Sequence, residues 1–517
     1  MQEMNKPRFV DIERYHLLLL GGLALAVRLV ALWTIDIPIV AWRPTELASI
    51  ALNYYRGGFH FLNPQINWGG NGPGYVEMEF PLIPFLTACL YEVFGVHDWV
   101  ALVIPVLSGI GTVLVTYSLT RLLLGSTAAF VAGIFTAVSP TLLGLSISIW
   151  PDPPMVFCCS VGILGLVKWV KSDRLVDFLT AGITAGMAIL LKVTALFIGS
   201  PILFLCICKY GSRWWKTSMV WILGVLILGP SMLWYWHAHN LYLNYHNTFG
   251  IFSAGYLKFG TIEILMNPDF YEHLAFRIAV YHVSPIVFVL LIYGATILQQ
   301  NRLSYVFHIW LLGVLIYFLI AARGVFIGHY QYVLPIVPAA TPLAALGAVR
   351  LVKKLSSGSY GKRKNSEKTI FLLGTAIYCL TITASIVLYF SHAIASESGW
   401  QNDRMTGLMV SRVTMPGALI VVVDNQMDEL KPETSMTPPN VFYFSDRKGW
   451  YQSMAWLSPN RIEELRSLGA KYLVITENSV SIFEKDFSSL RSYLNNHFNK
   501  SIASNEGIVF DLGYEHR

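Results

Sequence analysis

Charged residues are scarce in this chain of 517 residues, at 13% of the total, whereas an ordinary soluble domain carries roughly 25%. Hydrophobic residues make up 54%. This deficit of charge excludes a purely aqueous globular protein and indicates that lipid surrounds much of the chain. Cysteine is also sparse: all six cysteines lie in apolar blocks, and none follows Cys379. The sequence therefore contains neither a disulfide framework nor zinc-ligand spacing.

The apolar residues form blocks of about 17 to 24, the length that a helix needs to cross a hydrocarbon core roughly 30 Å thick. The first block follows a basic leader but lacks a small-residue cleavage site, so we interpret it as a retained helix. The pattern predicts an α-helical polytopic membrane protein with about eleven spans, near 15–34, 99–120, 126–144, 153–170, 177–191, 193–208, 217–236, 279–298, 306–322, 331–349 and 369–390.

The net charge of +6 reports topology and does not indicate nucleic-acid binding, because most Lys and Arg residues cluster at the ends of alternate spans. The positive-inside rule then predicts a multi-pass plasma (inner) membrane protein with a cytoplasmic N-terminus and an extracytoplasmic C-terminus. Basic clusters at both ends of 175–208 require an even number of crossings there. Two short helices meeting near Lys192, or a re-entrant pair, both satisfy this requirement.

Two domains follow from this pattern: a transmembrane domain over 1–391, with external loops 35–98 and 237–278, and a soluble extracytoplasmic α/β domain over 392–517. In the first loop, 46–55 is amphipathic and predicts a helix along the membrane surface. In the second domain, β-rich runs alternate with helical stretches such as 459–468. The expected strands are 418–423, 440–444, 471–476 and 507–512.

Ionisable groups at membrane depth cost several kcal/mol unless they are paired or hydrated, so each one here is a functional candidate. Most lie at the predicted outer ends of spans and together predict one outward-facing polar cavity. The acids are Asp36, Glu46, Glu77, Glu79 and Asp152, and the basic and histidine residues are Arg43, Lys192, His273, Arg277, His282, Arg323 and His329.

Structural alternatives remain open for several of these residues. Asp152 begins a helix, where an N-cap is the alternative to a catalytic role. Glu77 and Glu79 lie two apart, so in an extended segment both face one way, and a solvated loop face is the alternative. Lys192 lies within a long apolar stretch, and we expect a buried phosphate partner for it. Arg28 is equally consistent with a structural contact between helices.

An ordered set of short motifs resembles the membrane glycosyltransferases of the GT-C fold, in the group of dolichyl-phosphate-mannose protein mannosyltransferases and the lipid A aminoarabinose transferase. The resemblance covers roughly residues 15–350. Its motifs, in order, are Trp42-Arg43-Pro44-Thr45-Glu46, Glu79-Phe80-Pro81-Leu82, Pro151-Asp152, Leu191-Lys192 and His329-Tyr330-Gln331-Tyr332.

The resemblance implies an inverting sugar transfer from a polyprenyl-phosphate donor outside the cytoplasm, with no nucleotide. Glu46 takes the position of the first-loop acid, usually Asp in the family, and is the expected general base, assisted by Asp152. Glu79 and His273 match a pair that binds a divalent metal (Zn, Mg or Mn). Positions that match donor-phosphate ligands are Lys192, Arg277 and Tyr332, with Tyr330 lining the cavity beside them.

Electrostatics alone adds Arg43 and Arg323, because a phosphate leaving group needs cationic neutralisation. The sugar and the acceptor, whether protein, lipid or glycan, stay open. Two other functions also stay open: a transporter or flippase for a lipid-linked sugar, and an O-antigen ligase or polymerase. Against the transporter, the acids lie near one predicted surface and the chain shows no convincing internal repeat.

Overall fold

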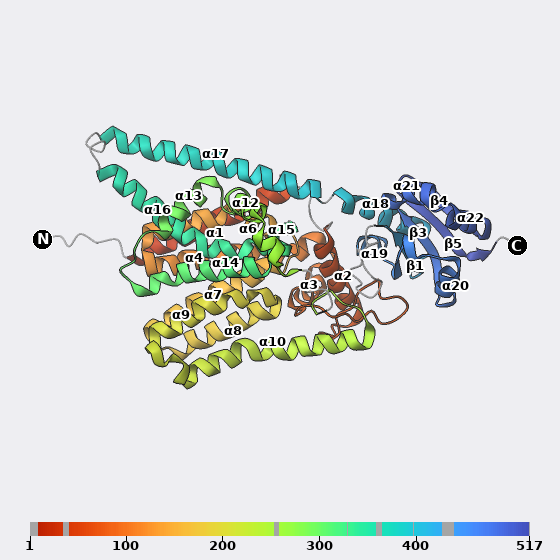
Figure 1. Cartoon of the computed structure of the whole chain (residues 1–517), viewed down its shortest axis with the longest axis horizontal. Helices are drawn as coiled ribbons and strands as arrows, with labels where there is room; N and C mark the ends of the chain where they lie inside the picture. The colour runs from red at the N-terminus through yellow and green to blue at the C-terminus, as the bar shows by residue number, and fades with distance from the viewer. Residues whose placement is uncertain are drawn as a thin grey trace. The chain divides into compact units, whose positions relative to one another are not determined.

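The structure, a computed structural model, describes residues 9–34, 41–252, 258–327, 329–357, 364–396, 398–425 and 439–515 (Figure 1). The chain forms two compact units, each built from segments far apart in the sequence. The first unit comprises Met1–Asp36, Leu102–Trp234 and Leu257–His392, and the second comprises Ile37–Ala101, Tyr235–Tyr256 and Ala393–Arg517. The second unit thus combines the C-terminal region with 37–101 and 235–256, which lie largely within the two predicted external loops.

Helices account for the first unit. Its long apolar helices follow from the hydrophobic blocks of the sequence, since a helix satisfies its own backbone hydrogen bonds in lipid. The main helices that lie in it wholly or largely are α1 (Phe9–Thr34), α4 (Asp98–Leu124), α5 (Ser126–Ala137), α6 (Pro140–Ser146), α7 (Asp152–Ser172), α8 (Leu175–Leu191), α9 (Gly199–Tyr210), α10 (Ser218–Tyr245), α11 (Ile262–Met266), α12 (Pro268–Arg277), α13 (Pro285–Ala295), α14 (Val306–Ile320), α15 (Ala322–Ile327), α16 (Val337–Ser357) and α17 (Lys364–Ser396).

Among the described residues, eight helices are long and apolar enough to cross a bilayer, and up to ten if two bent pairs each count as one span. The prediction of a multi-pass helical membrane protein is therefore confirmed. The single span expected over 279–298 is wrong: α12 and the turn that follows it run to His282, and α13 leaves at an angle of 111°. Ser284 has a φ of +82° and Pro285 has no backbone N–H to continue the helix, so the chain turns there.

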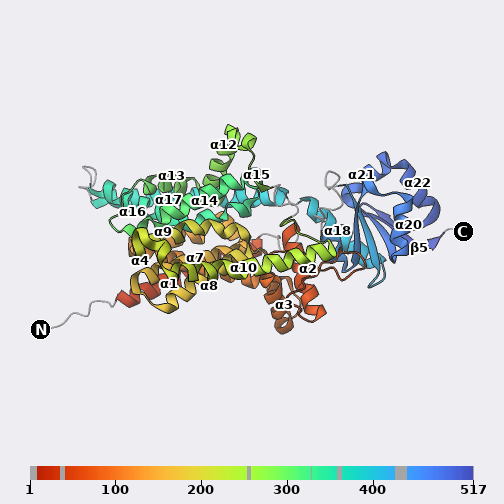
Figure 2. The same cartoon turned by 60° about the horizontal axis from the view of Figure 1, so that its bottom comes forward.

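The ambiguous stretch 175–208 consists of helical segments that meet at Lys192, as both alternatives require, and the choice between two crossings and a re-entrant pair stays a prediction. Helix α8 ends at Leu191, Lys192 is extended (φ −161°, ψ 120°), and the 3-10 helix η1 (Val193–Ile198) follows. Helices α7 and α8 lie side by side (Figure 2). A Cβ atom at Gly165 would lie 3.1 Å from the backbone nitrogen of Ala181, so glycine permits this close approach.

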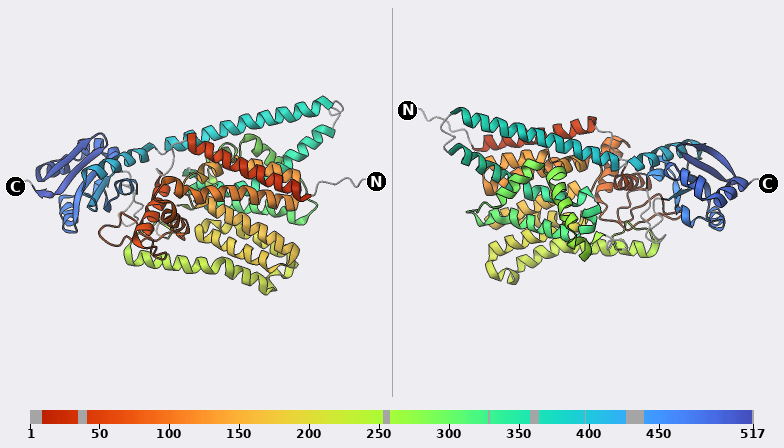
Figure 3. Two further views of the ribbon diagram at one scale, coloured as in Figure 1. Left: turned by 180° about the vertical axis from the view of Figure 1, so that it is seen from behind. Right: turned by 45° about the horizontal axis from the view of Figure 1, so that its top comes forward.

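Helix α1 packs beside α4 and α5 through small and aromatic side chains, including Leu20, Ala24 and Tyr117 (Figure 3). Arg28 of α1 is fully buried in this packing. Its Nε donates to the hydroxyl of Ser146 at 2.8 Å and its Nη1 donates to the carbonyl of Ala24 at 2.9 Å. Arg28 therefore makes the structural contact between helices that its sequence position allowed.

The second unit contains helices α2 (Trp42–Gly57) and α3 (Leu82–Phe94) and an α/β domain. The domain is a five-stranded sheet of order β2-β1-β3-β5-β4, in which β1 pairs parallel with β2 and β3, and β5 pairs antiparallel with β3 and β4. In register, Val421 lies opposite both Trp450 and Leu473. The elements are α18 (Ser398–Val413), β1 (Leu419–Asp424), α19 (Asn440–Ser445), β2 (Lys448–Ser453), α20 (Pro459–Ser467), β3 (Ala470–Thr476), α21 (Glu477–Asp486), α22 (Ser488–His497), β4 (Phe498–Ser504) and β5 (Gly507–Glu515).

The predicted C-terminal α/β domain is confirmed, with strands close to those expected at 418–423, 471–476 and 507–512 and a helix at 459–468. The strand expected over 440–444 is wrong, since these residues form α19, and the strand lies further along as β2. A short aromatic run does not distinguish helix from strand by its periodicity. Strand β4 was missed, because only Phe498 of it is buried and most of its residues are polar, which gives no alternating hydrophobic pattern.

Helix α2 forms where the amphipathic pattern predicted one, but its surroundings differ from the expectation of a helix lying on the membrane surface. Residues Pro44 to Leu52 and Tyr54 are all buried inside the protein. The apolar side chains of α2 therefore pack against protein neighbours, and the same packing buries Glu46.

Candidate active site

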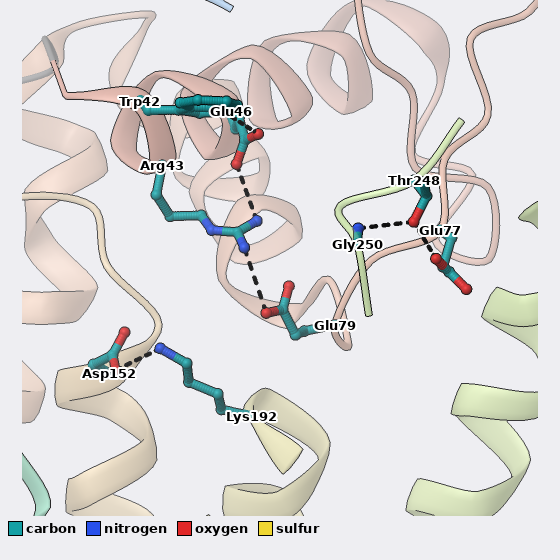
Figure 4. A network of polar contacts seen from close by, with 9 residues as sticks. All are labelled: Trp42, Arg43, Glu46, Glu77, Glu79, Asp152, Lys192, Thr248 and Gly250. Atoms are coloured by element: carbon teal, nitrogen blue, oxygen red, sulfur yellow. Dashed lines mark hydrogen bonds and ion pairs between the residues drawn. The ribbon is translucent and has the colours of Figure 1, made fainter. Parts of the chain in front are cut away.

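Helix α2 carries three residues of the candidate site in the second unit. Trp42, Arg43 and Glu46 lie in the first turns of this helix. The indole Nε1 of Trp42 donates a hydrogen bond of 2.6 Å to Oε1 of Glu46. The guanidinium of Arg43 places Nη1 at 3.0 Å from Oε2 of Glu46 and Nη2 at 3.6 Å from Oε1 of Glu79 (Figure 4). Arg43 therefore bridges two carboxylates that lie 33 positions apart in the sequence.

The carboxylate of Glu46 is almost completely buried, with 5% of the residue exposed. A buried charge is tolerated only when it is paired and hydrogen-bonded, and each of the two oxygens of Glu46 has a cationic or N–H partner. The guanidinium carbon of Arg43 also lies 4.9 Å from the ring centroid of Phe249, which adds a cation–π contact. The arrangement holds an ionised carboxylate in a fixed orientation.

Glu77 belongs to a different set of contacts from Glu79, although the two lie two residues apart. Its Oε2 accepts a hydrogen bond from the hydroxyl of Thr248, and its Oε1 lies 3.7 Å from Nδ1 of His239 (Figure 4). The side chain is fully buried, and this desolvation raises the pKa of Glu77 above its ordinary value. The solvated loop face considered for this residue is therefore wrong.

In the first unit, Asp152 and Lys192 form a buried ion pair. Lys192 Nζ lies 2.7 Å from Oδ1 of Asp152, whose side chain is 1% exposed (Figure 4). Helix α7 begins at Asp152, and the break between α8 and η1 presents Lys192. The N-cap alternative is wrong, because Pro151 holds the cap position and the Asp152 carboxylate bonds Lys192 instead. Lys192 Nζ also lies 5.3 Å from the ring centroid of Tyr332.

The other predicted residues of the first unit have mostly structural contacts. Arg277 donates to the carbonyl of Val325 at 2.6 Å, and fully buried His282 bonds the hydroxyl of Thr141 through Nδ1 at 2.6 Å. Arg323 is exposed. Three aromatic side chains pack against neighbouring rings: Tyr330 against Tyr281, Tyr389 and His392, His329 against Tyr332, and His273 against Phe326.

Each of the two predicted metal ligands has a contact within its own unit. Glu79 pairs with the guanidinium of Arg43, and the ring of His273 makes a 2.7 Å hydrogen bond through Nδ1 to the carbonyl of Asp269. Glu79 and His273 also belong to different compact units. Within the part of the chain that the structure describes, no three His, Cys, Asp or Glu residues gather where they would hold a metal ion. The metal stays a prediction, and no chemical step below depends on it.

The sequence did not predict several of the residues that contact these acids. Thr248 and His239 lie in an aromatic-rich external segment with no motif, and the role of Trp42 was not separated from the motif that contains it. Trp400 packs edge-to-face on Trp42, with ring centroids 5.5 Å apart, from a helix 358 positions away. The aromatic and polar composition of the segments that contain these residues is the sequence feature that could have indicated the contacts.

The family of dolichyl-phosphate-mannose-protein mannosyltransferases matches residues 78–236, a segment that contains Glu79, Asp152 and Lys192. Two Bacillus subtilis (strain 168) proteins whose names include the word mannosyltransferase, YycA and YkcB, are 29% and 23% identical over 164 residues. That stretch is 31% of this chain but only 24% and 23% of the two relatives. The matched segment therefore spans about a quarter of each relative.

Two solved structures are similar over nearly the whole chain. The crystal structure of ArnT from Cupriavidus metallidurans bound to undecaprenyl phosphate has a TM-score of 0.64 at 15% identity and covers 95% of this chain and 97% of its own. The archaeal oligosaccharyltransferase AglB from Archaeoglobus fulgidus, in complex with an inhibitory peptide and a dolichol-phosphate, has a TM-score of 0.56 at 13% identity and covers 96% and 73%. At these identities the likeness shows the fold, and the predicted GT-C fold is confirmed.

Proposed function

We propose that this protein is a membrane glycosyltransferase that moves a sugar from a polyprenyl-phosphate donor to a hydroxyl or similar acceptor, with inversion at the anomeric carbon. The observation that carries the proposal is the buried carboxylate of Glu46, held by Trp42 and Arg43. The family match over 78–236 and the lipid phosphates bound by ArnT and AglB support the class of donor.

Glu46 acts as the general base in this proposal. Its carboxylate accepts the proton of the acceptor hydroxyl, the acceptor oxygen forms a bond to the anomeric carbon, and the bond from that carbon to the phosphate oxygen breaks. The polyprenyl phosphate leaves with the electron pair. The indole N–H of Trp42 holds one oxygen of the Glu46 carboxylate, and Arg43 pairs with the other. This second oxygen can accept the proton once Arg43 binds a different partner.

In this proposal Arg43 exchanges its carboxylate partners for the donor phosphate. In the described structure it pairs with Glu46 and Glu79, and a guanidinium binds a phosphate with the same two-pronged geometry that it uses for a carboxylate. Binding of the donor phosphate by Arg43 would release the Oε2 atom of Glu46 for proton transfer. Within the first unit, Lys192 is a separate candidate for binding a phosphate: Asp152 pairs with its ammonium group, and Tyr332 lies beside it.

The test compares Glu46→Gln with Glu92→Gln, a matched change at an exposed position of helix α3. Mass spectrometry of cell-envelope glycans with and without the gene first identifies the sugar, and a reconstituted assay with the corresponding radiolabelled polyprenyl-phosphate sugar then measures transfer. We expect Glu46→Gln to lose transfer by a factor of roughly 10² to 10⁴, the usual contribution of a general base, and Glu92→Gln to retain it. Normal turnover by Glu46→Gln would end the proposal.

A further inference from the structure

Helix α2 is held at both ends by the C-terminal α/β domain within the second unit. At the start of the helix, Trp42 meets Trp400 of α18 edge-to-face, with ring centroids 5.5 Å apart and an interplanar angle of 67°. At its end, Nη1 of Arg56 lies 2.5 Å from Oδ1 of Asp446, the residue that follows α19. Glu46 lies between these two anchors.

The anchor at Trp400 rests on a helix that is tightly built into the domain. The hydroxyl of Thr406 in α18 donates to the carbonyl of Glu506 at 2.6 Å and accepts from the backbone N–H of Glu477 at 3.2 Å. A Cβ atom at Gly407 would lie 2.8 Å from the Cβ atom of Phe444, so α18 and α19 are in direct contact. The sheet therefore sets the position of α18, and α18 sets the position of Trp400.

The domain also pairs with the chain that follows α2. The backbone N–H of Gly449 in β2 donates to the carbonyl of Asn67 at 2.9 Å, and the N–H of Gly70 donates to the carbonyl of Gly449 at 2.7 Å. This pairing is an isolated antiparallel bridge, with Gly69 opposite Trp450 at the edge strand β2. Gly70 has a φ of +75°, and a Cβ atom there would lie 2.6 Å from Nε1 of Trp450, so only glycine fits.

We propose that the C-terminal domain positions the general base: Trp400 fixes the ring of Trp42, and the N–H of that ring fixes the carboxylate of Glu46. This inference rests on the proposed role of Glu46. Trp400 is a positioning residue, because it acts through Trp42. The Arg56–Asp446 pair is a second contact of α2 with the domain, and it is weaker because both side chains are exposed to solvent.

The test replaces Trp400 by Leu and by Phe and measures kcat, the KM for the polyprenyl-phosphate sugar, and the pH profile of kcat in the reconstituted full-length protein. The control is Trp456→Leu, a change at a largely exposed tryptophan of the same domain. We expect Trp400→Leu to lower kcat roughly tenfold with little change in KM, since a hydrogen bond to a charged group is misaligned. The acidic limb of the pH profile should move to higher pH, Trp400→Phe should recover most of the rate, and Trp456→Leu should change nothing.

The outcomes separate this inference from the function on which it rests. Unchanged kcat and pH profile in Trp400→Leu, beside an inactive Glu46→Gln, would overturn the positioning role and leave the function intact. An active Glu46→Gln would overturn both. If Trp400→Leu does not fold, the exchange of Arg56→Asp with Asp446→Arg tests whether the domain holds α2. Each single change should lower kcat, and the double exchange should restore it. Failure of the double exchange to restore kcat would refute the two-anchor arrangement.

A second inference concerns the first unit and rests on different residues. Helices α13 and α16 approach in backbone contact, because a Cβ atom at Gly294 would lie only 1.8 Å from the carbonyl oxygen of Leu343. Beyond that contact α13 ends at Ala295, whereas α16 continues to Ser357. A hollow of about 520 Å³, open to its surroundings, is lined by Tyr293, Ile297, Arg350, Lys353 and Lys354.

The lining of this hollow is cationic on one side and apolar on the other. Arg350, Lys353 and Lys354 follow the i, i+3, i+4 spacing of one helix face, and the lining residues that the structure describes include no acid. Three neighbouring residues of α16 expose apolar side chains: Leu351, Val352 and Leu355. Cations next to exposed apolar side chains match an amphiphile, with a phosphate for the cations and hydrocarbon for the leucines.

We infer that this hollow binds the phosphate head group of an anionic membrane lipid. Native mass spectrometry of the protein released from nanodiscs of phosphatidylglycerol, phosphatidylcholine or phosphatidylcholine with polyprenyl phosphate tests it. We expect retained phosphatidylglycerol, reduced several-fold by Arg350→Gln with Lys353→Gln and unchanged by the matched pair Arg213→Gln with Lys216→Gln. Equal retention by both variants would overturn the site, and retention of polyprenyl phosphate alone would assign the hollow to the carrier lipid instead.

Discussion

The indole Nε1 of Trp42 donates a 2.6 Å hydrogen bond to Oε1 of Glu46, one helical turn further along α2. The spacing of four residues places both side chains on one face of the helix, so the contact is local. The orientation of the indole ring is not local, since Trp400 packs against it from the C-terminal domain. One hydrogen bond therefore connects a carboxylate to a domain more than 350 positions away in the sequence.

Substituting Trp42 by Phe tests the hydrogen bond itself. Phenylalanine keeps the aromatic packing on Trp400 but lacks the N–H group, so Glu46 loses its donor. We expect kcat to fall roughly tenfold to a hundredfold while the protein still elutes as a folded species in detergent. Trp33→Phe, at an almost fully exposed position of α1, is the control. Equal kcat for the two variants would show that the hydrogen bond is not used.

Lys192→Met tests the buried pair with Asp152 in the first unit. Removing one partner leaves an uncompensated buried charge, which costs about 3–5 kcal/mol. We expect a clearly lower Tm in detergent for Lys192→Met, measured by intrinsic fluorescence. The double variant with Asp152→Asn should recover much of the Tm, because no buried charge remains, but should stay inactive. A Tm for the single variant equal to that of the unaltered protein would argue against burial of the pair.

Thr248→Val tests the second external segment. The hydroxyl of Thr248 donates to Oε2 of Glu77, whose side chain is fully buried, and valine has nearly the same shape without the donor. Leaving that oxygen without its donor should cost about 1–3 kcal/mol and lower the Tm accordingly. Thr296→Val, at an exposed threonine, is the matched change and should have little effect. Identical Tm values for the two variants would contradict the contact.

The buried carboxyl group of Asp403 in α18 should make the stability of the folded protein depend on pH. Burial, together with the smaller effect of the charge of Asp424, raises the pKa of Asp403 to about 8. The unfolded chain loses this proton near pH 3.8, so between that pH and about 8 the folded state binds more protons. Stability from this group is therefore complete below pH 3.8 and declines as the pH rises, by up to about 1.4 kcal/mol per pH unit.

The measurement is the Tm of the intact protein as a function of pH between 4 and 9. Asp403→Asn removes the titrating group, and we expect its Tm to fall less on the alkaline side than that of the unaltered protein. Asp486→Asn, at an exposed site of α21, should follow the unaltered protein. Parallel curves for all three proteins would mean that Asp403 titrates in its ordinary range.

Local patterns in the sequence predicted the helical membrane protein, the break at Lys192 and three of the five strands. A span is visible because its apolar residues are consecutive, and strands β1 and β3 are visible because they are buried, β-branched runs. The strand predicted at 440–444 failed because a short aromatic run fits either a helix or a strand. Strand β4 was missed because only one of its residues is buried and most are polar.

By itself the sequence determined that apolar helices cross a membrane, that an α/β domain follows them and which ionisable residues are candidates, because hydropathy and charge act over neighbouring residues. The tertiary structure decided the pairing of Arg43 with Glu79, of Lys192 with Asp152, and of Trp42 with Trp400. Those contacts join residues brought together only when the units fold, where burial makes a partner for each charge a physical requirement.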